Sequence, residues 1–198
     1  MISVGVTGSF ASGKSFILKY LNNLGFKTFS ADECVRELYR DESIQQQVLK
    51  LVPNIKTFDK VKIAELIYND SKSRERIQNF IHPLVIQNLE IFKQQNKTEE
   101  WIFAEIPLLF EMNFEKYFDL IIVTFCSEET RLKWAKQREG FNKKNYDKIG
   151  EIQLSQAEKV KRADLVINTD TNQIELEEQI AKQIKNLREL NERINTRY

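Results

Sequence analysis

The sequence contains very little cysteine and almost no histidine. Its 198 residues include two cysteines and one histidine, and Cys34 and Cys126 stand far apart without a CxxC spacing. A disulfide framework or a cysteine metal site is therefore not expected, and both cysteines are interpreted as packing thiols in a reducing compartment. The single histidine, His82, is too isolated to indicate a metal site.

The chain also lacks long apolar runs and an excess of charge. No uncharged apolar segment approaches the roughly 20 residues of a membrane-spanning helix. The N-terminus enters the apolar run Ile2–Val6 without the features of a signal peptide. The 30 Lys and Arg residues nearly balance the 29 Asp and Glu residues, which leaves a net charge of +1. We therefore expect a cytoplasmic protein with no membrane or nucleic-acid partner.

Hydrophobic residues make up 41% of the chain, which is enough for one sizeable core. Short apolar runs alternate with stretches of helical periodicity, and this alternation indicates an α/β fold with a parallel sheet flanked by helices. The expected strands are Ile2–Val6, Phe26–Phe29, Trp101–Ala104, Leu120–Phe125 and Leu165–Asn168.

Helical periodicity predicts the remaining parts. Turns are expected at Val52–Asn54 and His82–Pro83, and helices at Glu128–Arg138 and Thr171–Tyr198. We predict a single domain in three parts: a core of about 1–40, 98–126 and 160–198, a helical insertion of about 41–97, and a lid of about 127–159.

Residues Gly8–Ser15, GSFASGKS, match the phosphate-loop pattern GxxxxGK(S/T) in full. The match lies between an expected strand and an expected helix, where backbone N–H groups and the helix dipole would form an anion site. A chance match in a chain of this composition would occur in on the order of one chain in five hundred. The alternatives are a coincidental Gly-Ser turn and a loop that binds nucleotide without chemistry.

The phosphate loop predicts ATP and Mg²⁺ as ligands. Lys14 would reach the β and γ phosphates, and the Ser15 hydroxyl would bind the metal. The predicted ATP-binding residues are Gly8, Ala11, Ser12, Gly13, Lys14, Ser15 and Phe16.

Asp32 follows the second expected strand, at the edge of the sheet where the phosphate loop also opens. It could accept the proton of an acceptor hydroxyl as that hydroxyl attacks the γ-phosphorus. The alternative is that Asp32 caps the following helix. A phosphate loop at the same edge favours the catalytic interpretation.

Other polar residues have two interpretations each. Glu105, after the third strand, could lie near the metal or face solvent at a strand end. Arg131 and Arg138 are seven residues apart on one expected helix, so they would share a face and could clamp phosphate from a mobile lid; two solvated arginines are the alternative. Glu111 is interpreted as structural, and His82 as a turn or packing residue or a substrate contact.

Five segments, taken in order, resemble the dephospho-CoA kinase family, whose members use ATP to phosphorylate the ribose 3'-hydroxyl of dephospho-CoA. The segments are VTGSFASGKS, FSADECVREL, IHPLV, IPLLFE and QLSQAEKVKRADLVIN. The resemblance covers nearly the whole chain and implies a P-loop kinase fold like that of nucleoside monophosphate kinases, with a helical substrate-binding insertion and a lid. Ser9-Phe10-Ala11 makes the loop interior bulkier than the more usual Gly-rich loop of the family.

The resemblance also implies individual roles. Asp32 would be the general base, Lys14 would serve phosphate, and Arg138 would be the lid arginine that reaches phosphate. Ser15 would serve the metal, for which Glu105, from its place after the third strand, is the other predicted ligand. The wall that holds the acceptor would contain Asp32, His82, Pro107, Leu108 and Leu109.

Two rival functions are weighed against this one. The first is another small-molecule P-loop kinase with a nucleoside, nucleotide or shikimate-like acceptor, which should lack the IPLLFE segment and the Gln153–Ala163 pattern. The second is a nucleotide-binding module without turnover, which Asp32 and the arginines together disfavour. Oligomeric state is not predicted.

Overall fold

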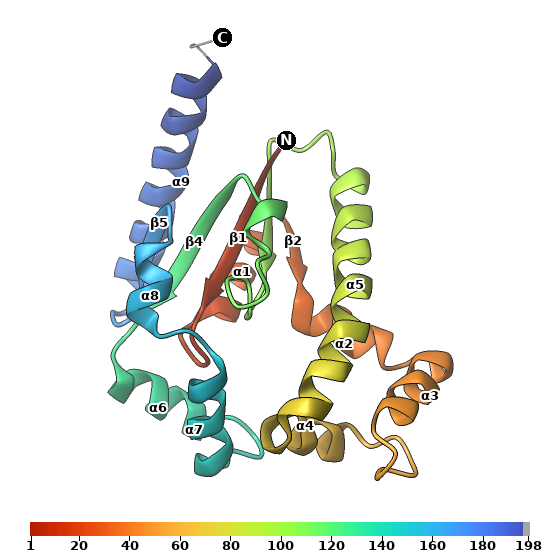
Figure 1. Cartoon of the computed structure of the whole chain (residues 1–198). Helices are drawn as coiled ribbons and strands as arrows, with labels where there is room; N and C mark the ends of the chain where they lie inside the picture. Colours follow the sequence, from red (N-terminus) through yellow and green to blue (C-terminus); the bar gives the residue numbers. More distant parts are fainter. Residues whose placement is uncertain (196–198) are drawn as a thin grey trace.

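The computed structural model describes the backbone of residues 1–195 and the side chains of residues 1–186. Figure 1 shows the arrangement of its helices and strands. The elements are β1 (Ile2–Gly8), α1 (Lys14–Asn23), β2 (Lys27–Ser30), α2 (Ala31–Leu38), α3 (Glu42–Leu51), α4 (Lys60–Asn69), α5 (Ser71–Gln95), β3 (Trp101–Glu105), η1 (Glu115–Tyr117), β4 (Leu120–Phe125), α6 (Glu128–Lys136), α7 (Lys143–Ile152), α8 (Gln156–Lys161), β5 (Leu165–Asn168) and α9 (Gln173–Asn195).

The five strands form a parallel sheet in the order β2-β3-β1-β4-β5. Strand β1 lies in the centre, where Val6 pairs with Glu105 of β3 on one side and Ile122 of β4 on the other. All five strands therefore end at the same edge of the sheet, the lower edge in Figure 1. The strand order reverses beside β1, and such a switch point is where open α/β sheets bind ligands.

Each face of the sheet carries its own hydrophobic core, because successive side chains of a strand point to opposite faces. Val4, Val6 and Phe103 pack with helices α1 and α9 on one face. Ile121 and Val123 of β4 belong to the core on the other face, which includes α5 and its neighbours. Burying one such side chain contributes about 1.5 to 3 kcal/mol.

Helix boundaries follow the capping residues of the sequence. The Asp59 and Asp70 carboxylates accept backbone N–H bonds at the starts of α4 and α5, and Ser127 does so for α6. Gly25, with a φ of +92°, lies just after the end of α1 in the left-handed region that suits glycine.

The turn expected at His82–Pro83 is wrong, because α5 continues through it from Ser71 to Gln95. Pro83 is exposed on this helix, where it removes one backbone hydrogen bond. Packing of the opposite face of the helix outweighs that loss, since this face buries Ile77, Ile81, Val85 and Leu89.

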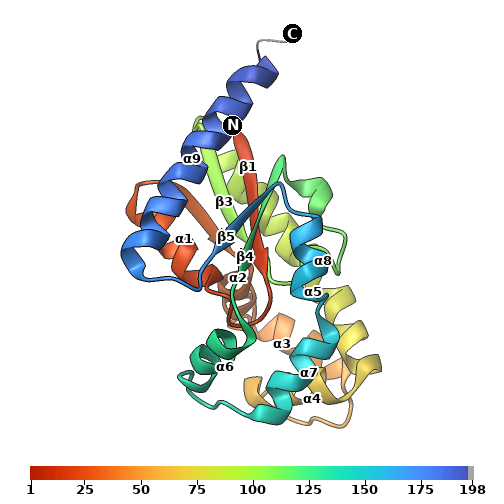
Figure 2. The same cartoon turned by 90° about the vertical axis from the view of Figure 1, so that its left-hand side faces the viewer.

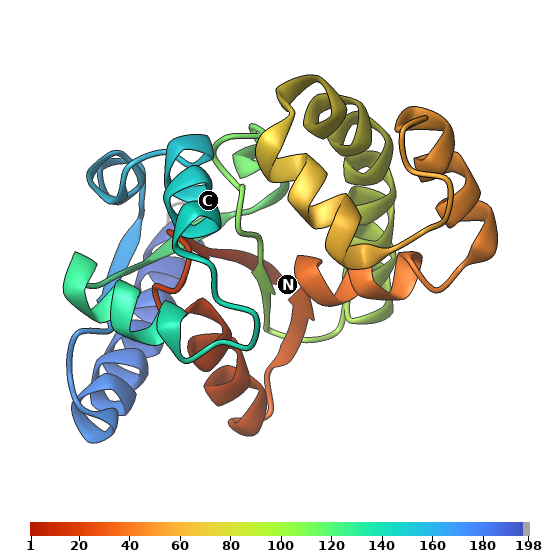
Figure 3. The ribbon, with the colours of Figure 1, turned by 90° about the horizontal axis from the view of Figure 1, so that it is seen from below.

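Two helical groups lie beyond the ends of the strands. Helices α3, α4 and part of α5 lie on one side and α6 and α7 on the other (Figures 1 and 3). The N-terminus and the end of α9 lie at the opposite end of the molecule (Figure 1). Within residues 1–195, no helix is both long enough and apolar enough to span a membrane.

The expected C-terminal helix is present as α9, and Leu176 and Ile180 bury its first turns against the core. Residues 196–198, which the prediction included, lie outside the described residues.

Candidate active site

The phosphate loop Gly8–Ser15 leaves the end of β1 and turns into α1. Gly13 adopts a φ of +86°, and an added Cβ would lie 3.0 Å from Cγ2 of Thr169. Both the backbone angle and the space therefore require glycine. The loop is anchored to β4 by a 2.6 Å hydrogen bond between the Ser12 and Thr124 hydroxyls.

Lys14 lies folded beneath the phosphate loop. Its Nζ donates to the carbonyl oxygens of Gly8, at 3.1 Å, and Ser9, at 2.9 Å. Only 7% of the residue is exposed. Burial lowers the pKa of Lys14 to about 8, although the nearby negative charge of Glu105 opposes this shift. The site therefore holds a cation whose charge is poorly compensated until an anion binds.

Glu105 is buried, with 3% of its surface exposed, so the alternative of a solvent-facing carboxylate is wrong. Its Oε1 accepts a 3.1 Å hydrogen bond from the Ser15 hydroxyl. Burial raises the pKa of Glu105, and the positive charge of Lys14 opposes that rise. Strand pairing explains its position, since Glu105 is level with Val6 of β1 and Ser30 of β2.

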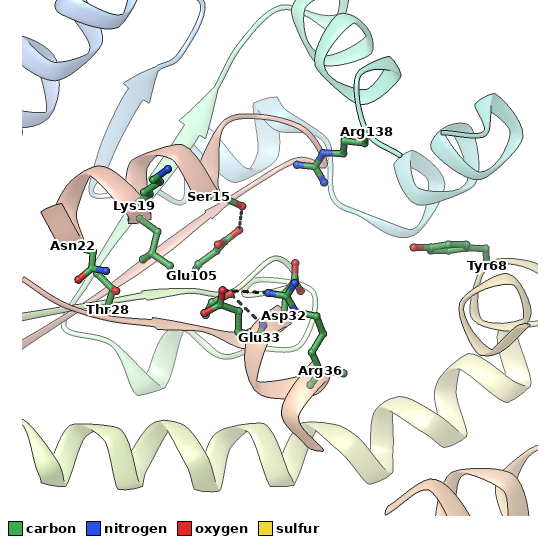
Figure 4. Close-up of a pocket in the computed structure, with 13 residues that line it drawn as sticks. Ser15, Lys19, Asn22, Thr28, Asp32, Glu33, Arg36, Tyr68, Glu105 and Arg138 are labelled. Atoms are coloured by element: carbon green, nitrogen blue, oxygen red, sulfur yellow. Dashed lines mark hydrogen bonds and ion pairs between the residues drawn. The ribbon is translucent and has the colours of Figure 1, made fainter. Parts of the chain in front are cut away.

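A cavity of about 820 Å³ opens beside the loop and is lined by Ser15, Asp32, Glu105 and Arg138. Figure 4 shows these side chains converging from different elements. Asp32 lies in the first turn of α2, but the side chain that caps this helix belongs to Ser30. The capping interpretation of Asp32 is therefore wrong, and its carboxylate is free to face the cavity.

The structure separates the two arginines that the sequence analysis placed on one helical face. Helix α6 ends at Lys136, so Arg138 lies beyond it and the helical spacing does not apply. Arg131 forms an ion pair with Glu128 and lies over the ring of Tyr146. Of these two arginines, Arg138 alone lines the larger cavity.

A second cavity, of about 200 Å³, adjoins Asp32 and contains the predicted wall residues Pro107 and Leu108. Leu109 is fully buried in the core, packed against Gly5, and so does not belong to this wall. His82 packs edge-on against Phe114, with ring centroids 5.5 Å apart, and lines neither cavity. Burial lowers the pKa of this histidine.

Several residues of these cavities carry no signal in the sequence. Tyr68 of α4 lines both of them, and Arg74 of α5 lines the smaller one. Burial raises the pKa of Tyr68, and the negative charge of Asp32 adds to that rise. Neither residue lies in a recognisable motif. They reach the cavities because the turn between α4 and α5 places them there.

Glu111, which the sequence analysis interpreted as structural, forms a buried ion pair of 2.8 Å with Lys159. The same carboxylate oxygen accepts a 2.8 Å hydrogen bond from the backbone N–H of Leu154. Lys159 also donates to the carbonyl oxygen of Pro107, at 3.2 Å. This network joins the segment that follows α7 to Pro107 in the wall of the smaller cavity.

The model that describes the dephospho-CoA kinase family matches residues 2–175. The chain belongs to the dephospho-CoA kinase family. A dephospho-CoA kinase from Rickettsia typhi is 51% identical over 94% of this chain and 98% of its own length. The family match therefore spans the phosphate loop, Asp32, Glu105 and Arg138.

Two solved structures resemble this dephospho-CoA kinase family member in fold. A protein from Thermus thermophilus has a TM-score of 0.79 at 25% identity and covers 92% of this chain and 95% of its own. A dephospho-CoA kinase from Campylobacter jejuni has a TM-score of 0.66 at 26% identity and covers 96% and 98%. The predicted parallel sheet and P-loop kinase fold are thereby confirmed.

Proposed function

We propose that this protein transfers the γ-phosphoryl group of ATP to the ribose 3'-hydroxyl of dephospho-CoA, giving coenzyme A and ADP. The observation that carries this proposal is the family match over residues 2–175, which includes a phosphate loop and a free carboxylate facing one cavity. The family match disfavours the nucleoside, nucleotide and shikimate acceptors. We place the reaction in the cytoplasm, in keeping with the free thiols of Cys34 and Cys126.

The donor nucleotide would extend from the phosphate loop into a cavity of about 380 Å³ behind it. Phe16, Trp134 and Leu176 give this cavity an apolar lining suited to a base and a ribose, while Ala11 and Gly13 place it beside the loop. When the triphosphate binds, Lys14 would exchange the loop carbonyl oxygens for phosphate oxygens.

The acceptor would occupy the cavities on the other side of the loop, which share Asp32 and Tyr68. As the acceptor oxygen bonds to the γ-phosphorus, the bond to the β–γ bridging oxygen breaks and ADP leaves. Asp32 accepts the hydroxyl proton during this step. Arg138 compensates the negative charge on the transferring group.

Ser15 and Glu105 are the residues that fit Mg²⁺, because a hydroxyl and a carboxylate are hard oxygen ligands 3.1 Å apart at the cavity. No cluster of three or more His, Cys, Asp or Glu residues that could hold a metal occurs in the described part of the chain. Two protein oxygens agree with the usual Mg²⁺ site of kinases, in which water and phosphate complete the shell. The bound ion would neutralise phosphate charge.

Water exclusion would come from contact between the lid and the insertion. Lys148 of α7 donates to the side chain of Asn69 of α4, and these two helices lie side by side in Figures 2 and 3. Ile149 and Ile152 of α7 add apolar surface to the acceptor cavity. Together these contacts would keep water, a competing acceptor, away from the γ-phosphate.

The direct test measures ADP formation by the purified protein with ATP and Mg²⁺. Dephospho-CoA is compared with adenosine, nucleosides, nucleotides and shikimate, and the product is identified by mass. We expect selective conversion of dephospho-CoA to coenzyme A. Preference for another acceptor would refute the substrate, and no ADP with any acceptor would favour a binding module without turnover.

The roles proposed for individual residues are tested with substitutions. Asp32→Asn should lower kcat about 10²- to 10⁴-fold, the usual contribution of general acid–base catalysis, while ATP affinity is retained. Lys14→Ala should lower both kcat and the affinity for ATP. Glu37→Gln is the matched control, because it removes a carboxylate from the same helix α2 without touching the larger cavity. Near-normal turnover of Asp32→Asn would contradict the general-base role.

A further inference from the structure

Phe10, inside the phosphate loop, contacts the lid at three separate points. Its ring lies 4.7 Å from Cζ of Arg138 and meets the ring of Tyr146 edge-on, with centroids 6.1 Å apart. Its backbone N–H donates a 2.8 Å hydrogen bond to Oε1 of Gln153. One residue of the loop therefore touches the segment after α6, helix α7 and the segment after α7.

These contacts belong to a small hydrophobic cluster apart from the two main cores. Its buried members are Ala11, Ala135 and Tyr146, and partly buried residues pack around them: Phe10, Leu132, Trp134 and Phe141. The cluster thus joins two residues of the phosphate loop to side chains of the lid. Phe10 is the larger of these two loop residues and the one that reaches the cavity arginine.

Arg138 differs from its neighbour Arg131 in how its side chain is held. Arg131 is fixed by a carboxylate and a tyrosine hydroxyl. Arg138 is exposed and, among the described side chains, has no carboxylate within ion-pair distance. The π-face of Phe10 is the contact that orients its guanidinium, which also lies close enough to influence the titration of Lys14 and Glu105.

We propose that Phe10 is a positioning residue, which holds Arg138 over the phosphate site before ATP and the acceptor arrive. A free arginine side chain has large rotamer entropy, and fixing its head group in advance lowers the cost of ordering it in the transition state. This inference rests on the role proposed above for Arg138. It adds that the aromatic ring in this chain's phosphate loop is needed for that role.

The test is a double-mutant cycle of Phe10→Leu and Arg138→Ala, with kcat and both KM values measured for each variant. Phe10→Leu keeps an apolar side chain but lacks the ring, so kcat should fall about 2- to 5-fold, as expected for an exposed cation–π contact. In the Arg138→Ala background the same change should have no further effect on kcat. Phe10→Tyr keeps the ring and should restore the kcat of the unchanged protein.

Phe58→Leu is the matched control, because Phe58 is also a partly buried ring in an edge-on pair, with Tyr39, away from the lid. It should leave kcat unchanged. Thermal unfolding of every variant separates loss of folded protein from loss of positioning, and the cycle cancels a stability loss that both Phe10→Leu proteins share.

Three results would overturn the inference or its basis, and they are distinguishable. If Phe10→Leu lowers kcat equally with and without Arg138, the ring only fills space. If Phe10→Leu has normal kcat while Arg138→Ala is impaired, the positioning role is wrong and the role of Arg138 stands. If Arg138→Ala itself has normal kcat, the role proposed for Arg138 fails, and the inference fails with it.

Discussion

Binding of ATP should draw a proton onto Lys14 in alkaline solution. In the free protein, burial lowers the pKa of this ammonium group from 10.5 to about 8. The phosphates of bound ATP place several negative charges where the Nζ atom now meets only carbonyl oxygens. A neighbouring anion favours the charged form of an amine, so binding should return the pKa towards its ordinary value.

The size of the effect follows from this shift. At pH 8 about half of the free protein has a neutral Lys14, so each ATP bound should take up about 0.5 proton. The uptake should be about 0.1 proton at pH 7 and about 0.9 at pH 9. Because the neutral form must first be protonated, ATP should bind about 10-fold more weakly at pH 9 than at pH 7.

The stability of the free protein should depend on pH in the opposite direction. The folded pKa of Lys14 lies below the unfolded value, so the folded state binds fewer protons between pH 8 and 10.5. Burial of the charged group opposes folding fully below pH 8, and this penalty, about 3 kcal/mol, fades as pH rises towards 10.5. ATP binding and the stability of the free protein thus respond to the same group with opposite signs.

Calorimetric titration with ATP, without acceptor, measures the uptake when it is repeated in buffers of different ionisation enthalpy. The terminal phosphate of ATP has a second pKa of about 6, so it contributes little to the proton uptake above pH 8. Lys14→Arg is the control, because arginine stays protonated throughout this range. Uptake near zero at pH 8 in the unchanged protein, or equal uptake in Lys14→Arg, would refute the reasoning.

Two further predictions concern stability, and urea unfolding measures both. Lys159→Met should lower the free energy of unfolding by about 3 to 5 kcal/mol, because it leaves the buried Glu111 carboxylate unpaired, and Lys159→Met with Glu111→Gln should recover part of that loss. Equal stability of the two variants would contradict this. Pro83→Ala should raise the free energy of unfolding by roughly 1 to 3 kcal/mol, because it removes an exposed proline from inside α5; a loss of stability would show that the helix needs the proline.

The phosphate loop and the parallel sheet could be predicted because their signals are local. A glycine-rich loop between an apolar strand and a helix specifies its own backbone, and Gly13 has the positive φ that the pattern requires. Short apolar segments bounded by turn residues likewise indicate the order of the strands and helices. The position of Asp32 at the carboxyl edge followed from the same topology.

Prediction was weaker where two interpretations differed only in packing. A carboxylate after a strand can face solvent or be buried, and only the pairing of β3 with its neighbours buries Glu105 beside Ser15. The spacing of Arg131 and Arg138 indicated one helical face, but α6 ends between them. Local proline chemistry likewise favoured a turn at His82–Pro83, and the apolar stripe of α5 overrode it.

The fold class, the family and the phosphate loop depend on short-range patterns and backbone requirements, so they can be recognised in the sequence. Which side chains meet across the cavity depends instead on how the elements pack. Tyr68 comes from α4, Arg74 from α5 and Arg138 from the segment after α6. Phe10 reaches Arg138 across 128 residues of chain. Contacts between such distant segments arise from packing of whole elements, which no local pattern encodes.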